Sequence, residues 1–252
     1  MLTATIPSEQ IATLRAQLAA NQVSRGPVLR FGIEAMDSRL ADQGLDAHAL
    51  HEIAPASPAL SDDAAATLFV AGLAARFGER NGTILWALTR FDLYAPGLDQ
   101  SGLPPERLLY SEAREDNEVL ALAEDGLRSA TLSAVVAEVT RISMTATRRL
   151  QLAAAEGRTP ILLFRRWRRR AVCPLSEPSS ATTRWRIRSA ATAPLGHSGI
   201  GRPCWEVELV RQRNGNPFSL TLEACDDTGR LALFPPARHR AAGADRATAR
   251  AA

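Results

Sequence analysis

The stretch LHEIAPASPALSDD, residues 50–63, decides how the rest of the chain is interpreted. Residues 50–53 predict a short strand, and a helix is expected from Ser61 to Phe77 with the Ser61 hydroxyl as its cap. Asp62 and Asp63 fall in the first turn, where negative charge stabilises a helix. A strand, a short loop and a helix in this order form the repeating unit of an α/β sheet.

The same alternation continues on the C-terminal side of this unit. Strands that are apolar throughout are typical of a parallel sheet covered on both faces. From residue 184 onward, apolar and polar residues alternate with a period of two, which predicts antiparallel strands. The fold class is therefore α/β, a mainly parallel sheet with helices on both faces and antiparallel strands at the C-terminal end. The remaining predicted strands are 83–88, 108–110, 132–138, 161–164, 184–188, 205–210, 218–222 and 231–234, and the remaining helices are 115–129 and 143–156.

Two segments flank the predicted domain, which we place at residues 28–236. Residues 1–27 are interpreted as an N-terminal helix and linker, in which Ile11, Leu14 and Leu18 form a narrow apolar stripe. This stripe is expected to dock on the domain or on a partner protein. Residues 237–252 are rich in Ala and Arg and predict a disordered basic tail.

The basic residues restrict the chemistry of the 252-residue chain, because all 30 of them are Arg. The absence of Lys excludes a Schiff-base lysine, a lysine general base and the lysine of a phosphate-binding P-loop. Residues 1–150 hold 13 Arg and 19 acidic residues, whereas residues 151–252 hold 17 and 8, so their net charges are −6 and +9. An anionic partner is therefore expected on the second part.

Other classes of protein and site are disfavoured by composition. The three cysteines are widely spaced and no CxxC pair occurs, so neither a zinc site nor a disulfide framework is indicated. We predict no metal and no cofactor. No apolar stretch reaches about 18 residues and no signal-peptide pattern precedes the domain, so we expect a cytoplasmic protein without a membrane span.

Several segments resemble the RecA family. Residues 29–37 and 43–45 resemble the segment that opens the RecA domain, and residues 51–53 the strand that leads into its P-loop. Residues 94–98 and 103–110 are similar to the ImuA branch of that family. The resemblance spans residues 28–236. It implies an accessory protein of DNA-damage-induced mutagenesis and translesion synthesis that works with an ImuB-like relative of the Y-family polymerases and a C-family DNA polymerase, with RecA and DNA as further candidate partners.

The resemblance places the P-loop between residues 53 and 61, where its chemistry is missing. The loop has no glycine, and Pro55 and Pro58 have no N–H to donate to a phosphate. Asp62 and Asp63 would repel a phosphate at the helix N-terminus. Glu138 ends the strand at the family's Walker B position. We therefore predict a degenerate nucleotide site without ATP hydrolysis and without catalytic residues, comprising Ala56, Ser57, Ser61, Asp62, Asp63 and Glu138.

A run of arginines follows the strand at 161–164. Arg pairs with phosphates and Trp stacks on unpaired bases, so the run is a candidate DNA contact. An acidic protein partner and a solvated charge run are the alternatives. Three further arginines share one face of the strand at 184–188 and extend the same predicted surface. The predicted DNA- or partner-binding residues are Arg165, Arg166, Trp167, Arg168, Arg169, Arg170, Arg184, Arg186 and Arg188.

Two other functions remain open from the sequence. One is an active RecA/RadA-type, DNA-dependent ATPase that uses Arg in place of Lys, although the larger planar guanidinium is a poor substitute. The other is a RecA-like inhibitor of cell division, which would cause filamentous cells when overexpressed. A nucleotide-binding titration tests the ATPase. A division inhibitor differs from a mutagenesis protein because its loss would cause no mutagenesis defect.

Overall fold

The computed structural model describes residues 26–78, 82–168, 172–192, 199 and 201–234. The predicted N-terminal helix, with Ile11, Leu14 and Leu18, lies outside these residues, as do Arg169, Arg170 and the predicted tail at 237–252.

Within the described residues, strands and helices follow the expected order. The strands are β1 (Val28–Leu29), β2 (Leu45–Asp46), β3 (Leu50–Pro55), β4 (Ile84–Leu88), β5 (Leu108–Glu112), β6 (Ala134–Val139), β7 (Ile161–Arg165), β8 (Thr183–Ala190), β9 (Cys204–Gln212), β10 (Phe218–Glu223) and β11 (Ala232–Leu233). The helices are α2 (Glu34–Asp37), α3 (Leu60–Phe77), α4 (Ala95–Asp99), α5 (Asp116–Ser129) and α6 (Met144–Gly157), and short 3-10 helices occur at Pro105–Arg107 and Pro174–Ser176.

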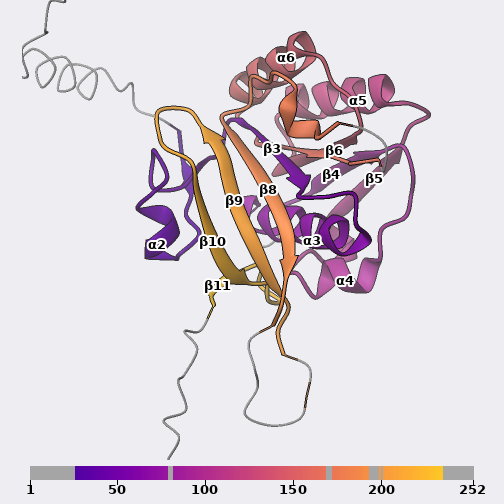
Figure 1. Ribbon diagram of the computed structural model, residues 1–252. Coiled ribbons are helices and arrows are strands. Elements are labelled where there is room, and N and C mark those ends of the chain that lie inside the picture. The colour runs from indigo at the N-terminus through magenta and orange to yellow at the C-terminus, as the bar shows by residue number, and fades with distance from the viewer. Residues whose placement is uncertain (1–25, 79–81, 169–171, 193–198, 200, 235–252) are drawn as a thin grey trace, which may run out of the picture.

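The described strands form one large mixed sheet and a separate β1–β2 pair. The large sheet has the order β11-β10-β9-β8-β3-β7-β6-β4-β5. Pairs from β8 through to β5 are parallel, and pairs from β8 to β11 are antiparallel. Figure 1 shows the long antiparallel strands β8, β9 and β10 beside the parallel part. The predicted fold class, a mainly parallel α/β sheet with antiparallel strands at the C-terminal end, is confirmed.

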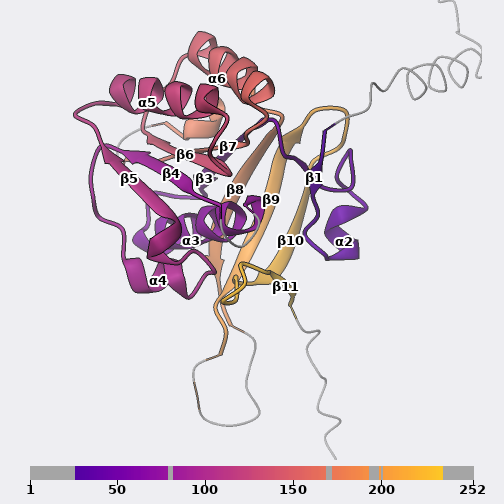
Figure 2. The same ribbon diagram turned by 180° about the vertical axis from the view of Figure 1, so that it is seen from behind.

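Helices cover both faces of the parallel part. Helices α5 and α6 lie together on one face and α3 packs on the other (Figures 1 and 2). Along β7, Leu162 and Phe164 join the core on the α3 side, whereas Ile161 and Leu163 join the core on the α5/α6 side. This alternation explains why the strand is apolar throughout. It also places the next two residues, Arg165 and Arg166, on opposite faces.

The start of α3 differs from the expectation. The helix begins at Leu60, and the capping position is Ala59 rather than Ser61. The described residues provide no side-chain hydrogen bond to cap it. Asp62, in the first turn of the helix, bonds to Ser57 in the preceding loop and to Ser189 on β8, and these contacts accompany the earlier start of the helix. At α6, by contrast, the predicted cap is confirmed: the Ser143 hydroxyl accepts a hydrogen bond from the Ala146 N–H at 3.2 Å.

Among the described residues, no helix combines the length and the apolar character that crossing a membrane requires.

Candidate functional site

The carboxyl ends of β3, β4, β6 and β7 meet at one edge of the sheet, which we call the carboxyl edge. Ligands of open α/β sheets bind outside the carboxyl ends of the strands. A cavity of about 420 Å³ opens here, and we call it the first cavity. It contains Asp63 and Glu138 of the predicted nucleotide site. Its lining residues are Pro58, Leu60, Asp63, Thr89, Arg90, Asp92, Glu138, Val139, Thr140, Arg166, Trp167 and Arg168.

The loop between β3 and α3 occupies the position that the resemblance gives to a P-loop, but two of its N–H groups, those of Ala56 and Ala59, are bonded within the protein. The Ala56 N–H donates to the Ile187 carbonyl oxygen at 2.7 Å, and the Ala59 N–H donates to the Ser57 hydroxyl at 3.3 Å. Pro58 in the loop and Pro55 at the end of β3 have no N–H. These groups therefore do not form the cradle of free N–H donors that holds a phosphate.

Asp62 holds this loop against β8. Its side chain is 5% exposed, and its carboxylate accepts hydrogen bonds from the Ser57 hydroxyl at 2.6 Å and from the Ser189 N–H at 2.9 Å. The next two N–H groups of the helix, those of Asp62 and Asp63, donate to the Ala59 carbonyl oxygen. A phosphate at this helix terminus would meet a buried carboxylate and donors that are already bonded.

The guanidinium group of Arg166 lines the first cavity and pairs there with three carboxylates of the chain. Its Nε lies 2.8 Å from a Glu138 carboxylate oxygen, and Nη2 lies 3.4 Å from Asp92. Its third nitrogen, Nη1, forms an ion pair with Asp63. The guanidinium also lies over the Phe164 ring at 4.6 Å from the centroid, a cation–π contact. We call these residues the Arg166 cluster.

The acids of this cluster are held in a poorly solvated place. Burial raises the pKa of Glu138, although Arg166 and a 2.7 Å hydrogen bond from the Trp86 indole N–H act in the opposite direction. Burial likewise raises the pKa of Asp63 against the effect of Arg166. Burial lowers the pKa of Arg166, but the surrounding carboxylates outweigh it, and the pKa lies above its ordinary value. Arg166 therefore supplies the charge that a lysine, a metal ion or a ligand would otherwise bring.

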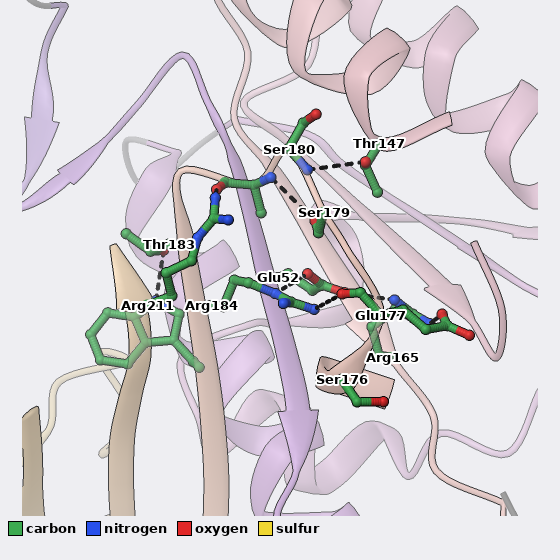
Figure 3. Close-up of polar contacts among 12 residues, drawn as sticks. Glu52, Thr147, Arg165, Ser176, Glu177, Ser179, Ser180, Thr183, Arg184 and Arg211 are labelled. Carbon is green, nitrogen blue, oxygen red and sulfur yellow. Dashed lines mark hydrogen bonds and ion pairs between the residues drawn. The ribbon is translucent and has the colours of Figure 1, made fainter. Parts of the chain in front are cut away.

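A second charged cluster lies on the opposite face of the sheet (Figure 3). Glu52, in the centre of β3, is fully buried and contacts Arg165 at 2.6 Å and Arg184 at 2.7 Å. Arg165 also contacts Glu177 at 2.6 Å, and Arg184 donates to the Glu177 carbonyl oxygen at 2.9 Å. We call these residues the Glu52 cluster. It ties three neighbouring strands to the chain segment that links β7 to β8.

This arrangement corrects part of the predicted basic surface. Arg165 and Arg184 were expected to contact DNA or a partner, but their exposed fractions are 0% and 7%. Both side chains point into the sheet face that carries Glu52, because their neighbours Phe164 and Trp185 occupy the α3 face. Neither guanidinium can reach a ligand in solution.

The other predicted arginines have different surroundings. On β8, Arg186 pairs with Glu208 at 3.1 Å and Arg188 with Glu206 at 3.2 Å, so this face carries mixed charge. Trp167 is half-buried and lines the first cavity, and Arg168 is exposed beside it. Within the described residues, Arg168 is the part of the run at 165–170 that presents a cation to solvent.

A second cavity of about 530 Å³ adjoins the first and was not predicted. It shares Thr89, Thr140 and Arg168 with the first cavity, and Arg114 and Arg141 also line it. The sequence does carry a signal for two of these residues, since Arg114 and Arg141 each come two residues after the end of a strand, β5 and β6. The remaining lining residues are Glu115, Asp116 and Asn117.

Comparison with known proteins shows what the chain is similar to. No protein-family model matches the chain. The chain is 37% identical over 204 residues to Protein ImuA of Caulobacter vibrioides, in strains NA1000 / CB15N and ATCC 19089 / CIP 103742 / CB 15, an alignment that covers 79% of this chain and 84% of that protein.

Two solved structures are similar to this one. The RadB recombinase has a TM-score of 0.54 and 13% identity, covering 82% of this chain and 100% of RadB, which supports a RecA-like fold. SulA from Pseudomonas aeruginosa has a TM-score of 0.40 and 22% identity, covering 46% of this chain and 96% of SulA.

Proposed function

The chain belongs to the ImuA family, and on this premise we propose that it is a non-catalytic, RecA-like accessory protein of DNA-damage-induced (SOS) mutagenesis. In this proposal it assembles with an ImuB-like protein and a mutagenesis-associated C-family polymerase during translesion synthesis, in the cytoplasm and at the nucleoid. RecA and DNA are further candidate partners. The proposed activity is assembly and not nucleotide chemistry.

The observation that carries the absence of catalysis is the Arg166 cluster. A bound triphosphate with its metal ion would have to displace Arg166 from Glu138, Asp63 and Asp92. It would also come close to the buried Asp62 carboxylate, and two like charges about 4 Å apart repel by about 4 kcal/mol at an effective dielectric constant of 20. The site therefore satisfies its own charges and disfavours a nucleotide.

The same cluster disfavours an ATPase that uses Arg in place of Lys. Arg166 is the arginine that contacts Glu138 and Asp63 of the predicted nucleotide site, and all three of its guanidinium nitrogens contact protein carboxylates. The likeness to SulA covers less than half of this chain and does not extend the proposal to cell division.

The proposed partner contacts follow from the sequence and from what the structure leaves exposed. The stripe of Ile11, Leu14 and Leu18 remains a proposed contact for a partner protein. Trp167 and Arg168, together with Arg169 and Arg170 outside the described residues, remain a proposed contact for DNA or a partner.

The experiment compares damage-induced mutation frequency in a strain that lacks the gene with strains complemented by wild type or by Glu138→Gln. We expect the deletion to abolish induced mutagenesis and both genes to restore it, because no step uses Glu138 as a catalytic base. Thermal unfolding of the purified variant checks that it folds. Saturable Mg-ATP binding tighter than about 1 mM by titration calorimetry, or hydrolysis lost in the folded Glu138→Gln variant, would contradict the proposal.

A further inference from the structure

The geometry of the carboxyl edge points to a docking surface, and we propose that it binds an acidic segment of a protein partner that also carries leucine or phenylalanine side chains. The inference rests on the proposed function in one respect, since both assign an assembly role to the chain. It adds the place of contact and the chemistry of the partner.

Three arginines supply the charge for this surface. Arg114, Arg141 and Arg168 line the second cavity and are exposed, and none of them forms an ion pair with a described residue. They follow β5, β6 and β7, so the sheet brings together residues that are far apart in the chain. We call them the arginine rim. Unpaired guanidinium groups bind carboxylates through two parallel hydrogen bonds.

The acids near the rim do not neutralise it. The Asp116 carboxylate accepts hydrogen bonds from the N–H groups of Thr140 and Arg141, each at 3.0 Å. The Glu118 carboxylate accepts one from the Arg114 N–H at 2.8 Å. These carboxylates hold the backbone of the loops in place. Three arginines and two carboxylates, those of Glu115 and Asp116, line the second cavity, so its net charge is +1.

Exposed apolar side chains lie along the same edge. Leu60, at the start of α3, is 84% exposed and lines the first cavity, which shares the lining residues Thr89, Thr140 and Arg168 with the second. Phe91 and Tyr94, which follow β4, are 56% and 74% exposed. Arginine and aromatic side chains are enriched in protein interfaces and at their energetic hot spots. This composition favours a protein partner with apolar side chains of its own.

Charge balance distinguishes such a partner from DNA. The two cavities together are lined by five arginines and five carboxylates, so their net charge is zero. A phosphodiester backbone carries continuous negative charge and needs a net positive track. Separate carboxylates on a peptide can instead pair with individual guanidinium groups. The residues counted are Arg90, Arg114, Arg141, Arg166, Arg168, Asp63, Asp92, Glu115, Asp116 and Glu138.

The test measures binding of three labelled probes to the full-length protein by fluorescence anisotropy. The probes are a synthetic peptide of Asp and Glu with interspersed Leu and Phe, the same peptide with Ser at the apolar positions, and a single-stranded oligothymidylate. We expect the first peptide to bind best. The variant Arg114→Gln/Arg141→Gln/Arg168→Gln should weaken that binding by about tenfold or more.

Matched variants separate the rim from general charge. Arg186→Gln/Arg188→Gln removes a partly buried and an exposed arginine on β8, away from the rim, and should leave peptide binding unchanged. Leu60→Ser should reduce the advantage of the apolar peptide over the Ser peptide. Circular dichroism melting curves verify that each variant folds, and a Lys-substituted rim should retain part of the affinity, because the charge remains.

Three results would overturn the inference: no saturable binding of the acidic apolar peptide, equal peptide binding by the rim variant, or oligothymidylate binding that is tighter than peptide binding and depends on the rim. These results differ from failure of the proposed function. That failure appears as normal induced mutagenesis in the deletion strain, whatever the peptide binds.

Discussion

Arg165 and Arg166 are consecutive residues with opposite environments. The Arg165 guanidinium is 1% exposed and belongs to the Glu52 cluster, inside the sheet face covered by α5 and α6. The Arg166 guanidinium is 21% exposed and belongs to the Arg166 cluster, in a cavity on the α3 face. A run of arginines in the sequence is therefore not one surface. The pleat of the strand distributes it between two faces, and only residues beyond the strand end reach solvent.

The two clusters also differ in what they contribute. Burying a charge pair costs desolvation that the attraction between the charges barely offsets, so a buried pair contributes mainly by excluding wrong arrangements. The Glu52 cluster sets β3, β7 and β8 relative to one another. The Arg166 cluster gives three carboxylates at a solvent-accessible edge of the sheet one shared arginine partner from the chain itself.

The largest expected effect is at Arg165. Arg165→Met should lower the free energy of unfolding by about 3–5 kcal/mol, because it leaves the Glu52 carboxylate buried opposite Arg184 alone. Urea unfolding followed by circular dichroism measures the change. The matched control Arg186→Met breaks a half-exposed pair and should cost about 1 kcal/mol or less. Equal losses of unfolding free energy in the two variants would show that the buried Glu52 cluster contributes no more to stability than a pair near the surface.

A smaller effect is expected at Arg166, because two of its three partners, Asp63 and Asp92, are 31% and 47% exposed. Arg166→Gln should cost about 1–3 kcal/mol at neutral pH, because Glu138 keeps only its hydrogen bond from Trp86. Burial already raises the pKa of Glu138, and a raised acid pKa in the folded state means that stability falls as pH rises. The deficit of the variant relative to wild type should therefore shrink as pH is lowered.

A double-mutant cycle tests the Arg166 pairing directly. Arg166→Gln combined with Glu138→Gln should destabilise the protein by less than the sum of the single substitutions, since the charged partner is gone. Additive losses in urea unfolding would show that the two side chains are not coupled. Such a result would contradict a stabilising interaction between Arg166 and Glu138.

A third effect concerns His51, the uncharged neighbour of Glu52 in β3. Its ring is fully buried, contacting the Thr183 hydroxyl at 2.7 Å and the Asp46 carbonyl oxygen at 2.8 Å. Burial lowers the pKa of His51, and the hydrogen bond to Asp46 opposes this. The folded state then binds fewer protons than the unfolded state, so this stability is complete above about pH 6.5 and declines below it.

His51→Gln should remove that part of the pH dependence. The free energy of unfolding of wild type should fall more steeply from about pH 7.5 to about pH 5.5 than that of the variant. Chemical unfolding at a series of pH values measures the two slopes. Identical slopes would mean that His51 is not held in its neutral form.

The smallest effect is expected for Arg188 and Glu206 on the outer face of β8 and β9. Both side chains are about half exposed, so Arg188→Gln should change stability by about 0–1 kcal/mol, and added salt should abolish the difference. A salt-independent loss as large as that of Arg165→Met would show that this face is buried by contacts outside the described residues.

The sequence by itself determined the order of the main elements and the fold class, and together with the family resemblance it predicted a degenerate P-loop. These depend on local chemistry: apolar periodicity along each strand, prolines without N–H groups, and the absence of glycine and lysine where phosphate binding needs them. The cap of α3 lies two residues before the predicted position, at Ala59 instead of Ser61, and Asp62 in the first turn bonds to Ser189 on β8, a contact with a strand much later in the chain.

Only the tertiary structure decided which charges meet. Glu52 contacts Arg165 and Arg184, which are 113 and 132 residues away, because the strand order places β3 between β7 and β8. The same order brings Arg114, Arg141 and Arg168 around one cavity. Charge pairing between neighbouring strands depends on sheet order and on the face that each side chain occupies, and a one-dimensional pattern of residues does not specify that order.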